Sequence, residues 1–535
     1  MPEPCDLFEY TTGRWIYNDA LRHRERRRAF NVPQLKRLAA LAVQQKEDDV
    51  AGFEKLAEGG FNRSFKVTMR NGFQFVARIP YPATEPKSLV VASEVATIDF
   101  LRSHGIPVPE IFGYSAVADN PAGTEYIFME LVQGQNLGDI WYTLSEQERI
   151  TLVTKLVELE SRLFALRFQA SGSLYYYDDL PTHEDPVIVP NPRLGSTRRF
   201  CIGPDTSLAL WYGRRLDLSV ERGPYRDSLA VLTAAATKEI AYLKRFGRAL
   251  QPFQRLRREA YNYQPQSHLE HIMNLEKYLK VAPHLASLNR SALHRPVLRH
   301  PDLQPNNILV SNELEIKGLI DWQHSTVLPL FLQCGIPQNL QNYGDEISES
   351  LQIPTLPNNF NELEEKERLQ HAELYRKRQL HYLYVKLTAD KNPEHYDALT
   401  YDFRALRRRI FHHARDPWEG DNIDLKADLV TLSRNWKQVN PDAKSPCPIF
   451  FSDEESSECL RLEREQSEAD EQLQDCHEAI GVGTEGWVPV AYYEEAKRRE
   501  RKFKAVALDA AETDEERARV QEDWIFDDFC EEDYM

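Results

Sequence analysis

Two β-prone apolar runs lie within residues 65–80, on either side of an Asn71-Gly72 pair. An Asn-Gly pair between such runs is typical of a tight turn, so this pattern predicts an antiparallel hairpin. Residues 87–105 are rich in apolar positions at helical spacing and end on a glycine, which predicts a helix that stops there. Residues 125–131 then have the pattern of a buried strand. Together these segments predict a small α+β unit.

Helical patterning dominates after about residue 140, and residues 1–50 have the pattern of a helical extension. Residues 453–535 alternate acidic runs with helix formers, which predicts solvated helix and a frayed end. The sequence therefore predicts an N-terminal extension at 1–50, a β-rich unit at 51–131, a helical unit at 132–440 and an acidic helical extension at 441–535.

The charge balance limits the class of partner. Lys and Arg total 66 against 83 Asp and Glu, a net charge of −17. Binding along a nucleic acid needs a basic surface, so this balance argues against a general nucleic-acid-binding protein. The most basic run, residues 22–30, fits either a nucleic-acid patch or a solvated helix, and Glu25 inside it favours the helix.

The cysteines and the N-terminal residues bear on the compartment. The seven cysteines are scattered and include no C-x-x-C pair, which favours reduced thiols in an intracellular protein. No apolar run is long enough to span a membrane. There is no secretory signal, and the N-terminus carries early acids, so it is a poor match to a mitochondrial presequence.

The segment 300–322 places many polar residues around two short apolar runs. Residues 308–310 and 314–320 are β-prone with a short turn between them, which predicts a second hairpin. Asn307 precedes the first strand and Asp321 follows the second, so both lie at the open end of a hairpin whose strands are about 5 Å apart. An amide oxygen and a carboxylate brought together there predict a hard-oxygen site suited to Mg²⁺.

Asp302 precedes Asn307 across a loop braced by Pro305, and it is expected to stand next to the metal site. Such an aspartate can accept or orient the proton of a hydroxyl group. Metal-neutralised phosphate oxygens, an aligned nucleophile and an adjacent aspartate are the parts that phosphoryl transfer requires. The alternative interpretation is a polar loop that caps the hairpin, with Asp302 and Asn307 bonded to backbone groups.

His300, Asp302 and Asn307, followed by Ile-Asp-Trp at residues 320–322, resemble the catalytic-loop and metal-aspartate motifs of the aminoglycoside phosphotransferase family. The resemblance extends over about residues 50–340. It implies a two-lobed protein-kinase-like α+β fold, with a small β-rich N-terminal lobe and a helical C-terminal lobe. It also implies use of ATP and Mg²⁺.

The resemblance assigns further residues to a nucleotide site. Gly59 and Gly60 match the short loop whose backbone N–H groups approach the phosphates. Glu130 and Leu131 match the hinge whose backbone meets adenine. These residues are therefore expected around the nucleotide, although ATP and GTP stay open as alternatives.

Two features depart from the family pattern. Arg78 stands where the usual kinase strand has lysine. Glu94 matches the glutamate of the first helix of the N-terminal lobe, and the Arg78 guanidinium can still pair with it. The rigid, forked guanidinium nevertheless differs from the point charge of a lysine ammonium group. The acidic residue that often follows the metal aspartate is missing, so support for that loop is expected from elsewhere. No arginine precedes Asp302 directly, which favours a small-molecule acceptor over a protein acceptor.

The resemblance implies transfer of the γ-phosphoryl group of ATP to a hydroxyl group of a small molecule. Asp302 is expected to orient or deprotonate the acceptor, Asn307 and Asp321 to hold Mg²⁺, Arg78 to steady the phosphates, and His300 to brace the loop. The alternative is a catalytically weak nucleotide-binding scaffold that acts through protein partners in mitochondrial maintenance. The acidic C-terminal extension could contact such partners.

A longer context, residues 75–114 and 210–219, resembles the fungal altered-inheritance-of-mitochondria branch of that family. The resemblance implies a mitochondrial protein, whereas the N-terminal residues lack a clear presequence. A cytoplasmic location stays open as the alternative.

Three other patterns have ordinary structural explanations. The G-x-G-x-x-G at residues 481–486 lacks a preceding strand, so a helix C-cap and turn is expected there. His268 and His271 lack a third metal ligand nearby, which favours a solvated helix. The tyrosines of residues 174–179 could hold a cationic acceptor, but packing is the favoured interpretation.

Overall fold

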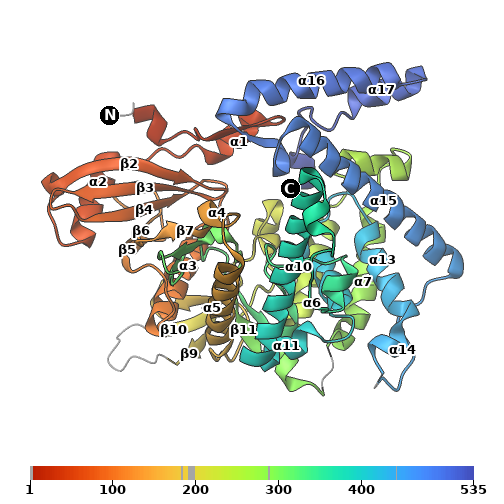
Figure 1. Ribbon diagram of the computed structural model, residues 1–535, viewed down its shortest axis with the longest axis horizontal. Helices are drawn as coiled ribbons and strands as arrows, with labels where there is room; N and C mark the ends of the chain where they lie inside the picture. Colours follow the sequence, from red (N-terminus) through yellow and green to blue (C-terminus); the bar gives the residue numbers. More distant parts are fainter. Residues whose placement is uncertain (1–3, 182–184, 191–198, 287–288, 442) are drawn as a thin grey trace.

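The computed structural model describes residues 4–181, 185–190, 199–286, 289–441 and 443–535. A five-stranded antiparallel sheet lies at one end of the molecule, and helices make up most of the remainder (Figure 1). The predicted α+β fold, with a β-rich part and a helical part, is confirmed. In spatial order the strands of the sheet are β2 (Val50–Glu58), β3 (Asn62–Met69), β4 (Gln74–Pro80), β6 (Tyr126–Glu130) and β5 (Ile111–Ser115).

Strand β4 is buried on both faces, since α2 (Val32–Ala42) and α3 (Lys87–Ser103) cover opposite sides of the sheet. Phe75 packs into the core on the α2 side, and Val76 packs with the apolar residues of α3. Because side chains alternate along a strand, Arg78 shares the α3 side with Val76. The strand pattern therefore aims Arg78 at a helix and at the helical part of the molecule beyond it.

The helical part has two packing groups. The helix α10 lies against α5, and the helices α6, α7, α12 and α13 pack on one another around a separate apolar core. Their bounds are α5 (Glu146–Phe164), α6 (Ser228–Phe246), α7 (His268–Val281), α10 (Glu365–Lys391), α12 (Arg404–Arg415) and α13 (Ile423–Arg434).

The hairpin predicted within residues 308–320 is confirmed. Strands β12 (Ile308–Val310) and β13 (Ile316–Leu319) pair antiparallel, and β7 (Gln135–Asn136) pairs with β12 as a third strand. Ile308 and Leu319 join the apolar core that α3 and α5 share, so this hairpin is fixed between the two parts of the molecule.

The N- and C-terminal segments of the chain meet on one side of the molecule (Figure 1). Strand β1 (Gly13–Trp15) pairs antiparallel with β15 (Trp487–Pro489). Ile16 shares a small apolar core with Trp524 and Phe526. The helices beside this core are α15 (Asp453–Ile480), α16 (Tyr493–Ala510) and α17 (Asp514–Glu522).

The prediction of a frayed acidic end is wrong. Asn18 donates a hydrogen bond from Nδ2 to Glu531 Oε1 at 2.6 Å, and Arg22 pairs with the same carboxylate at 2.6 Å. The Tyr534 hydroxyl donates to the carbonyl of Gln251 at 2.9 Å. Glu531 is 3% exposed. Partners that lie far away in the sequence hold this segment, and no local pattern shows them.

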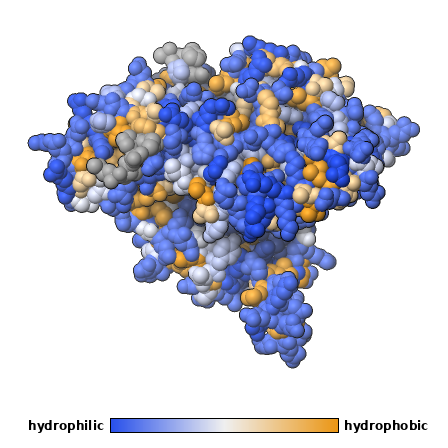
Figure 2. Space-filling model, turned by 90° about the horizontal axis from the view of Figure 1, so that it is seen from above, coloured by the Kyte–Doolittle hydropathy of each residue, from blue (hydrophilic) through white to orange (hydrophobic). Residues whose placement is uncertain are grey.

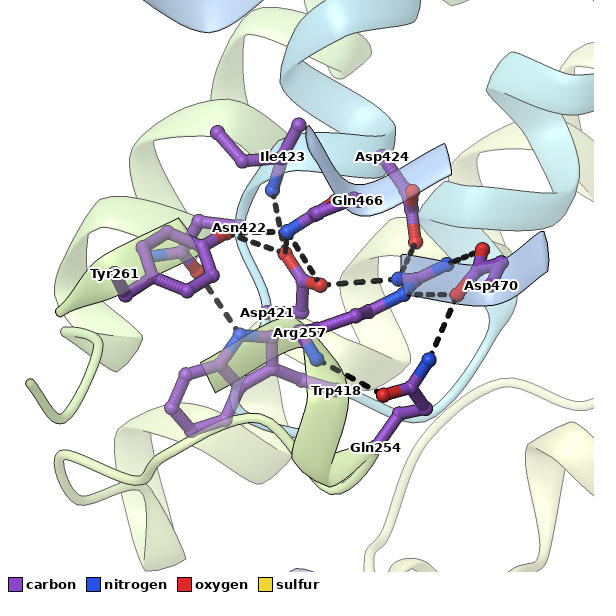
Figure 3. A network of polar contacts seen from close by, with 10 residues as sticks. All are labelled: Gln254, Arg257, Tyr261, Trp418, Asp421, Asn422, Ile423, Asp424, Gln466 and Asp470. Carbon is purple, nitrogen blue, oxygen red and sulfur yellow. Dashed lines mark hydrogen bonds and ion pairs between the residues drawn. The ribbon is translucent and has the colours of Figure 1, made fainter. Parts of the chain in front are cut away.

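Helix α15 docks on the helical part through a network around Arg257 (Figure 3). The Arg257 guanidinium contacts Asp470 of α15 at 2.6 Å and Asp421 at 3.0 Å. From the same helix, Gln466 donates to the Asp421 carboxylate at 2.9 Å. The acidic residues Glu454 and Glu458 of α15 are exposed, as predicted for a solvated helix face.

The basic run at residues 22–30 is not the plain solvated helix that was predicted. It forms α1 (Asp19–Arg26), but the side chains of Arg22 and Arg26 are only 11% and 13% exposed. Arg26 lies over the Trp15 ring at 4.5 Å, and Arg28 donates to Thr124 Oγ1 at 2.9 Å. These arginine side chains therefore contact partners within the chain.

The prediction of a solvated helix is also wrong for His271. This side chain is 4% exposed on α7, facing Trp418, and burial lowers its pKa to about 4. Within the described residues, no three His, Cys, Asp or Glu side chains gather as a metal site.

The other two minor predictions are confirmed in outline. Gly481 ends α15 in the left-handed conformation, with φ 81°, as a C-cap residue. The tyrosine run packs, although in a strand: β8 (Ser173–Tyr176) is buried, and the Tyr175 hydroxyl donates to the carbonyl of Pro204 at 2.7 Å.

The face seen in Figure 2 is mostly hydrophilic, with hydrophobic residues scattered over it. Over the described ranges, none of the helices combines the length and the apolar character needed to span a membrane.

Candidate active site

Arg78 joins the sheet to the helical part. Its Nη1 contacts Glu94 Oε1 on α3, and its Nη2 donates to Asp321 Oδ1 at 2.5 Å. The Arg78 and Glu94 side chains are 10% and 2% exposed, whereas that of Asp321 is 44% exposed. The guanidinium fork therefore holds a buried carboxylate on one arm and an accessible one on the other.

The loop 300–307 is braced from within by His300. Its Nε2 lies 2.9 Å from the carbonyl of Ile320, and its Nδ1 accepts from the Asp302 backbone N–H at 3.1 Å. Burial lowers the pKa of His300 to about 4, so the ring is neutral, with Nε2 as donor. The ring also packs edge-on against Trp322. His300 thus positions the loop and is not placed as a base, in agreement with the prediction.

Asp302 is exposed and held in orientation by two amides. Gln304 donates to Asp302 Oδ2 at 2.5 Å, and Asn307 donates to the same oxygen at 3.1 Å and to the Asp302 carbonyl at 2.9 Å. Burial and then the charge of Asp321 raise the pKa of Asp302. The carboxylate is therefore a better proton acceptor than an ordinary aspartate.

Asn307 and Asp321 lie together at the open end of the β12–β13 hairpin. The Ile320 N–H donates to the Asn307 carbonyl at 3.0 Å, which closes this end of the ladder. Asp321 has φ 67°, a left-handed conformation that non-glycine residues seldom adopt. Burial would raise the pKa of Asp321, but the charge and hydrogen bond of Arg78 bring it below its usual value. The carboxylate is fully ionised at neutral pH.

These residues fit a magnesium ion. Asn307 uses its Nδ2 on Asp302, and its Oδ1 accepts no hydrogen bond from any described residue. Mg²⁺ is usually held by one or two protein oxygens together with substrate phosphates and water. Asn307 Oδ1 and the Asp321 carboxylate would be those two protein ligands. Asp302, at hydrogen-bond distance from Asn307, would stand beside them.

The predicted phosphate loop is the turn between β2 and β3. The Gly59 N–H donates to the Asn62 carbonyl at 2.9 Å, and a Cβ added at Gly60 would meet no atom within 4 Å. The Phe61 carbonyl accepts from Thr84 Oγ1 at 2.7 Å, and the Phe61 ring lies 5.3 Å from that of His324. The loop is anchored at Phe61 and leaves the Gly60 backbone open.

The predicted hinge lies at the end of β6, beside the sheet. The Glu130 backbone N–H donates to the Glu110 carbonyl at 2.8 Å, and the Glu130 carboxylate accepts from the Glu110 N–H at 3.0 Å. The Leu131 carbonyl accepts from Gln133 Nε2 at 3.1 Å. The side chain of Glu130 is therefore bound to the residue that precedes β5.

Sequence reasoning missed Gln323 and His324, which follow Asp321. Gln323 is 6% exposed and accepts from Arg78 Nη2 at 3.2 Å. His324 has φ 57°, and its Nδ1 lies 2.7 Å from the carbonyl of Thr206. The available signal was that two polar residues directly follow Asp321 and the buried Trp322. The Thr206 contact holds His324, in the loop that follows Asp321.

A comparison with known families identifies the family of this chain. A model of the phosphotransferase enzyme family matches residues 52–331, and the chain belongs to this family. The family resemblance predicted from the motifs is therefore confirmed.

Two relatives align over most of their length. The chain is 33% identical over 501 residues to a subtelomeric hrmA-associated cluster protein of Aspergillus fumigatus, covering 87% of this chain and 95% of that one. It is 25% identical over 571 residues to altered inheritance of mitochondria protein 9, mitochondrial, of Saccharomyces cerevisiae, covering 91% and 87%.

Solved structures match more distantly. A streptomycin–ATP–APH(2")-IIa ternary complex aligns with TM-score 0.33 and 12% identity, over 72% of this chain and 92% of that one. A putative fructosamine-3-kinase from Thermobifida fusca aligns with TM-score 0.33 and 12% identity, over 81% and 100%.

Proposed function

We propose that the protein transfers the γ-phosphoryl group of ATP to a hydroxyl group of a small molecule. The observation that carries this proposal is that Arg78 pairs with Asp321 at the open end of the hairpin. Asn307, which begins that hairpin, donates to Asp302. Arg78 comes from the sheet, whereas the other three residues come from the single segment 302–321. A charged fork, two oxygen ligands and an aspartate are what phosphoryl transfer requires of a protein.

The metal ligands would act first in binding. Mg²⁺, when bound, would neutralise charge on the phosphate oxygens. Asp321 would turn from Arg78 toward that ion, and Arg78 would then be free to contact the α- and β-phosphates while Glu94 keeps it in place. The backbone of Gly59 and Gly60 would cover the phosphates.

Asp302 would receive the acceptor. Its carboxylate is exposed and is oriented by Gln304 and Asn307, so one oxygen is fixed and the other can accept a hydroxyl proton. The raised pKa of Asp302 favours that transfer. His300 would position the loop and would not accept the proton.

The location we propose is mitochondrial, with the cytoplasm as the alternative. It is supported by relatives named as mitochondrial proteins that align over most of this chain. The acceptor class, a small molecule, is supported by the family.

A second candidate function is a nucleotide-binding scaffold with weak or no turnover. The Arg78–Asp321 pair favours it, because two groups needed for the nucleotide are bound to each other. Both functions require the nucleotide site, and only the first requires Asp302.

Transfer of label from [γ-³²P]ATP to small molecules in a fungal metabolite extract tests the proposal. We expect a new labelled product with the wild-type protein and none with Asp302→Asn. Label transfer that is equal in both proteins would contradict the role of Asp302. ATP binding without transfer, across extracts from several growth conditions, would favour the scaffold.

A further inference from the structure

A cavity with a volume of about 890 Å³ lies in the helical part of the molecule. Its walls come from α12, from α10 and from the segment 335–351. None of Arg78, Asp302, Asn307 and Asp321 lines it. This volume is in the range of cavities that hold small organic ligands.

The cavity carries a basic stripe from one helix. Arg404, Arg408 and His412 are spaced four residues apart on α12, so they lie on the same helix face. Arg404 donates to the Tyr343 hydroxyl at 3.2 Å, and Arg408 donates to the carbonyl of Cys334. The buried Nε of Arg408 has no hydrogen-bond partner.

Neither of these two arginines has a carboxylate partner among the residues that the structure describes. The other two arginines of the cavity do have one: Arg299 pairs with Glu160 at 2.8 Å and Arg409 with Asp428 at 2.7 Å. The charges of Arg404 and Arg408 therefore remain uncompensated.

The acid of the wall, Glu349, accepts from the Gly344 N–H at 2.9 Å and forms no ion pair with Arg404 or Arg408. His381 accepts from the Asn342 N–H through Nδ1 at 2.9 Å. Burial, together with Arg408 and other neighbouring cations, lowers the pKa of His412 to about 3. The arginines of the wall outnumber its acids, and a buried guanidinium such as that of Arg408 is costly without an ion-pair partner, so the cavity favours an anion.

Part of the wall is apolar. Val385 of α10, Leu399 and Ile336 line the cavity and are 5%, 4% and 7% exposed. An inorganic anion would leave these apolar residues without a partner. A ligand with an anionic group and an apolar body would contact both the arginines and the apolar residues.

We propose that this cavity is a binding site for a small organic phosphate. The phosphate would lie between Arg404 and Arg408, where a guanidinium can donate two parallel hydrogen bonds. The organic part would lie against Val385 and Leu399. Arg299 lines the cavity and directly precedes His300 in the chain, so this site adjoins the loop that carries Asp302.

Calorimetric titration of the full-length protein with phenyl phosphate, inorganic phosphate and phenol tests the proposal. We expect saturable binding of phenyl phosphate, weaker binding of inorganic phosphate and no binding of phenol. Arg404→Gln should weaken the binding of phenyl phosphate by about tenfold or more, because a charged hydrogen bond is lost. Arg434→Gln, an exposed arginine on α13, is the matched control and should bind like the wild type.

Three outcomes would overturn the proposal. Equal affinity of Arg404→Gln and wild type would place the phosphate elsewhere. Loss of binding in Asp321→Ala would place it at the nucleotide site. Co-sedimentation with phosphatidic-acid vesicles that depends on Arg404, without binding of free phenyl phosphate, would identify a membrane lipid in place of a soluble ligand. Because Arg404 is partly exposed, its variant is expected to fold, and circular dichroism checks this.

Discussion

Arg78 and Asp321 are separated by 243 positions in the sequence, yet Arg78 Nη2 lies 2.5 Å from Asp321 Oδ1. This ion pair connects the sheet to the hairpin that carries Asn307. It also joins the cation that we propose for the phosphates to the carboxylate that we propose for the metal. Under that proposal, binding of a magnesium–nucleotide complex would require this pair to separate, while the Arg78–Glu94 pair could persist.

The two ion pairs of Arg78 should contribute unequally to stability. Arg78→Gln leaves Glu94 buried without its cation, which should lower the free energy of unfolding by about 3 kcal/mol. Asp321→Asn removes the ion-pair partner of Arg78 whose side chain is 44% exposed, so it should lower the free energy of unfolding much less. Urea unfolding measures both. A loss for Arg78→Gln no larger than that for Asp321→Asn would contradict this account, and Arg78→Gln with Glu94→Gln should recover part of the loss.

Asn307 should set the magnesium requirement. Asn307→Ala removes an oxygen ligand, so about tenfold more Mg²⁺ should be needed for the same nucleotide-induced stabilisation. Gln304→Ala is the control, since Gln304 also donates to Asp302 but is not placed as a ligand. A Mg²⁺ titration followed by thermal unfolding compares the two variants. An equal shift in both would assign the effect to the orientation of Asp302.

Asp302 and Asp321 should change stability with pH in opposite directions. The pKa of Asp321 is lowered in the fold, so its contribution is present above the ordinary aspartate pKa and is lost as pH falls through the folded value. The pKa of Asp302 is raised, so its ionised form opposes folding above that range.

Stability curves from pH 7 down to the acid range should show this contrast. Relative to wild type, Asp321→Asn should lose stability at neutral pH, and the difference should shrink on acidification. For Asp302→Asn, the free energy of unfolding should instead increase relative to that of the wild type as pH rises from the acid range to neutrality. Parallel curves for both variants would refute the assigned pKa directions.

Glu531 should control the docking of the C-terminal segment. Glu531→Ala leaves Arg22 and Asn18 without their buried acceptor, which should cost about 3 kcal/mol in local stability. Hydrogen exchange at β1 and β15 should then become faster, because the two strands pair beside this contact. Glu532→Ala, at an exposed neighbouring residue, is the matched control. Unchanged exchange in Glu531→Ala would show that β1–β15 pairing does not depend on it.

The parts of the site that follow local patterns were predictable from the sequence. The turn at Asn71-Gly72 and the two-residue period of β4 put Arg78 on the side of α3. Asn307 and Asp321 flank one short hairpin, so their proximity follows from a single turn. In each case a few neighbouring residues carry the information.

The contacts that depend on distant segments were not predictable. Nothing near Glu531 indicates that Asn18, 513 positions away, is its partner. The acidic composition of this segment predicted a frayed end. The arginine that pairs with its Glu531 carboxylate and the amide that donates to it lie in distant elements. The support of His324 by the Thr206 carbonyl is of the same kind, since a backbone acceptor has no sequence signal.

The most direct test of the proposed nucleotide site is thermal unfolding of the full-length protein with and without ATP and Mg²⁺, beside Asp321→Ala. A ligand at 100 times its dissociation constant stabilises a protein by about 2.7 kcal/mol, enough to be measured in a chain of this size. The account predicts a Mg²⁺-dependent rise in Tm for the wild type that is lost in Asp321→Ala. No rise at millimolar ATP and Mg²⁺, or an equal rise in both proteins, would contradict it.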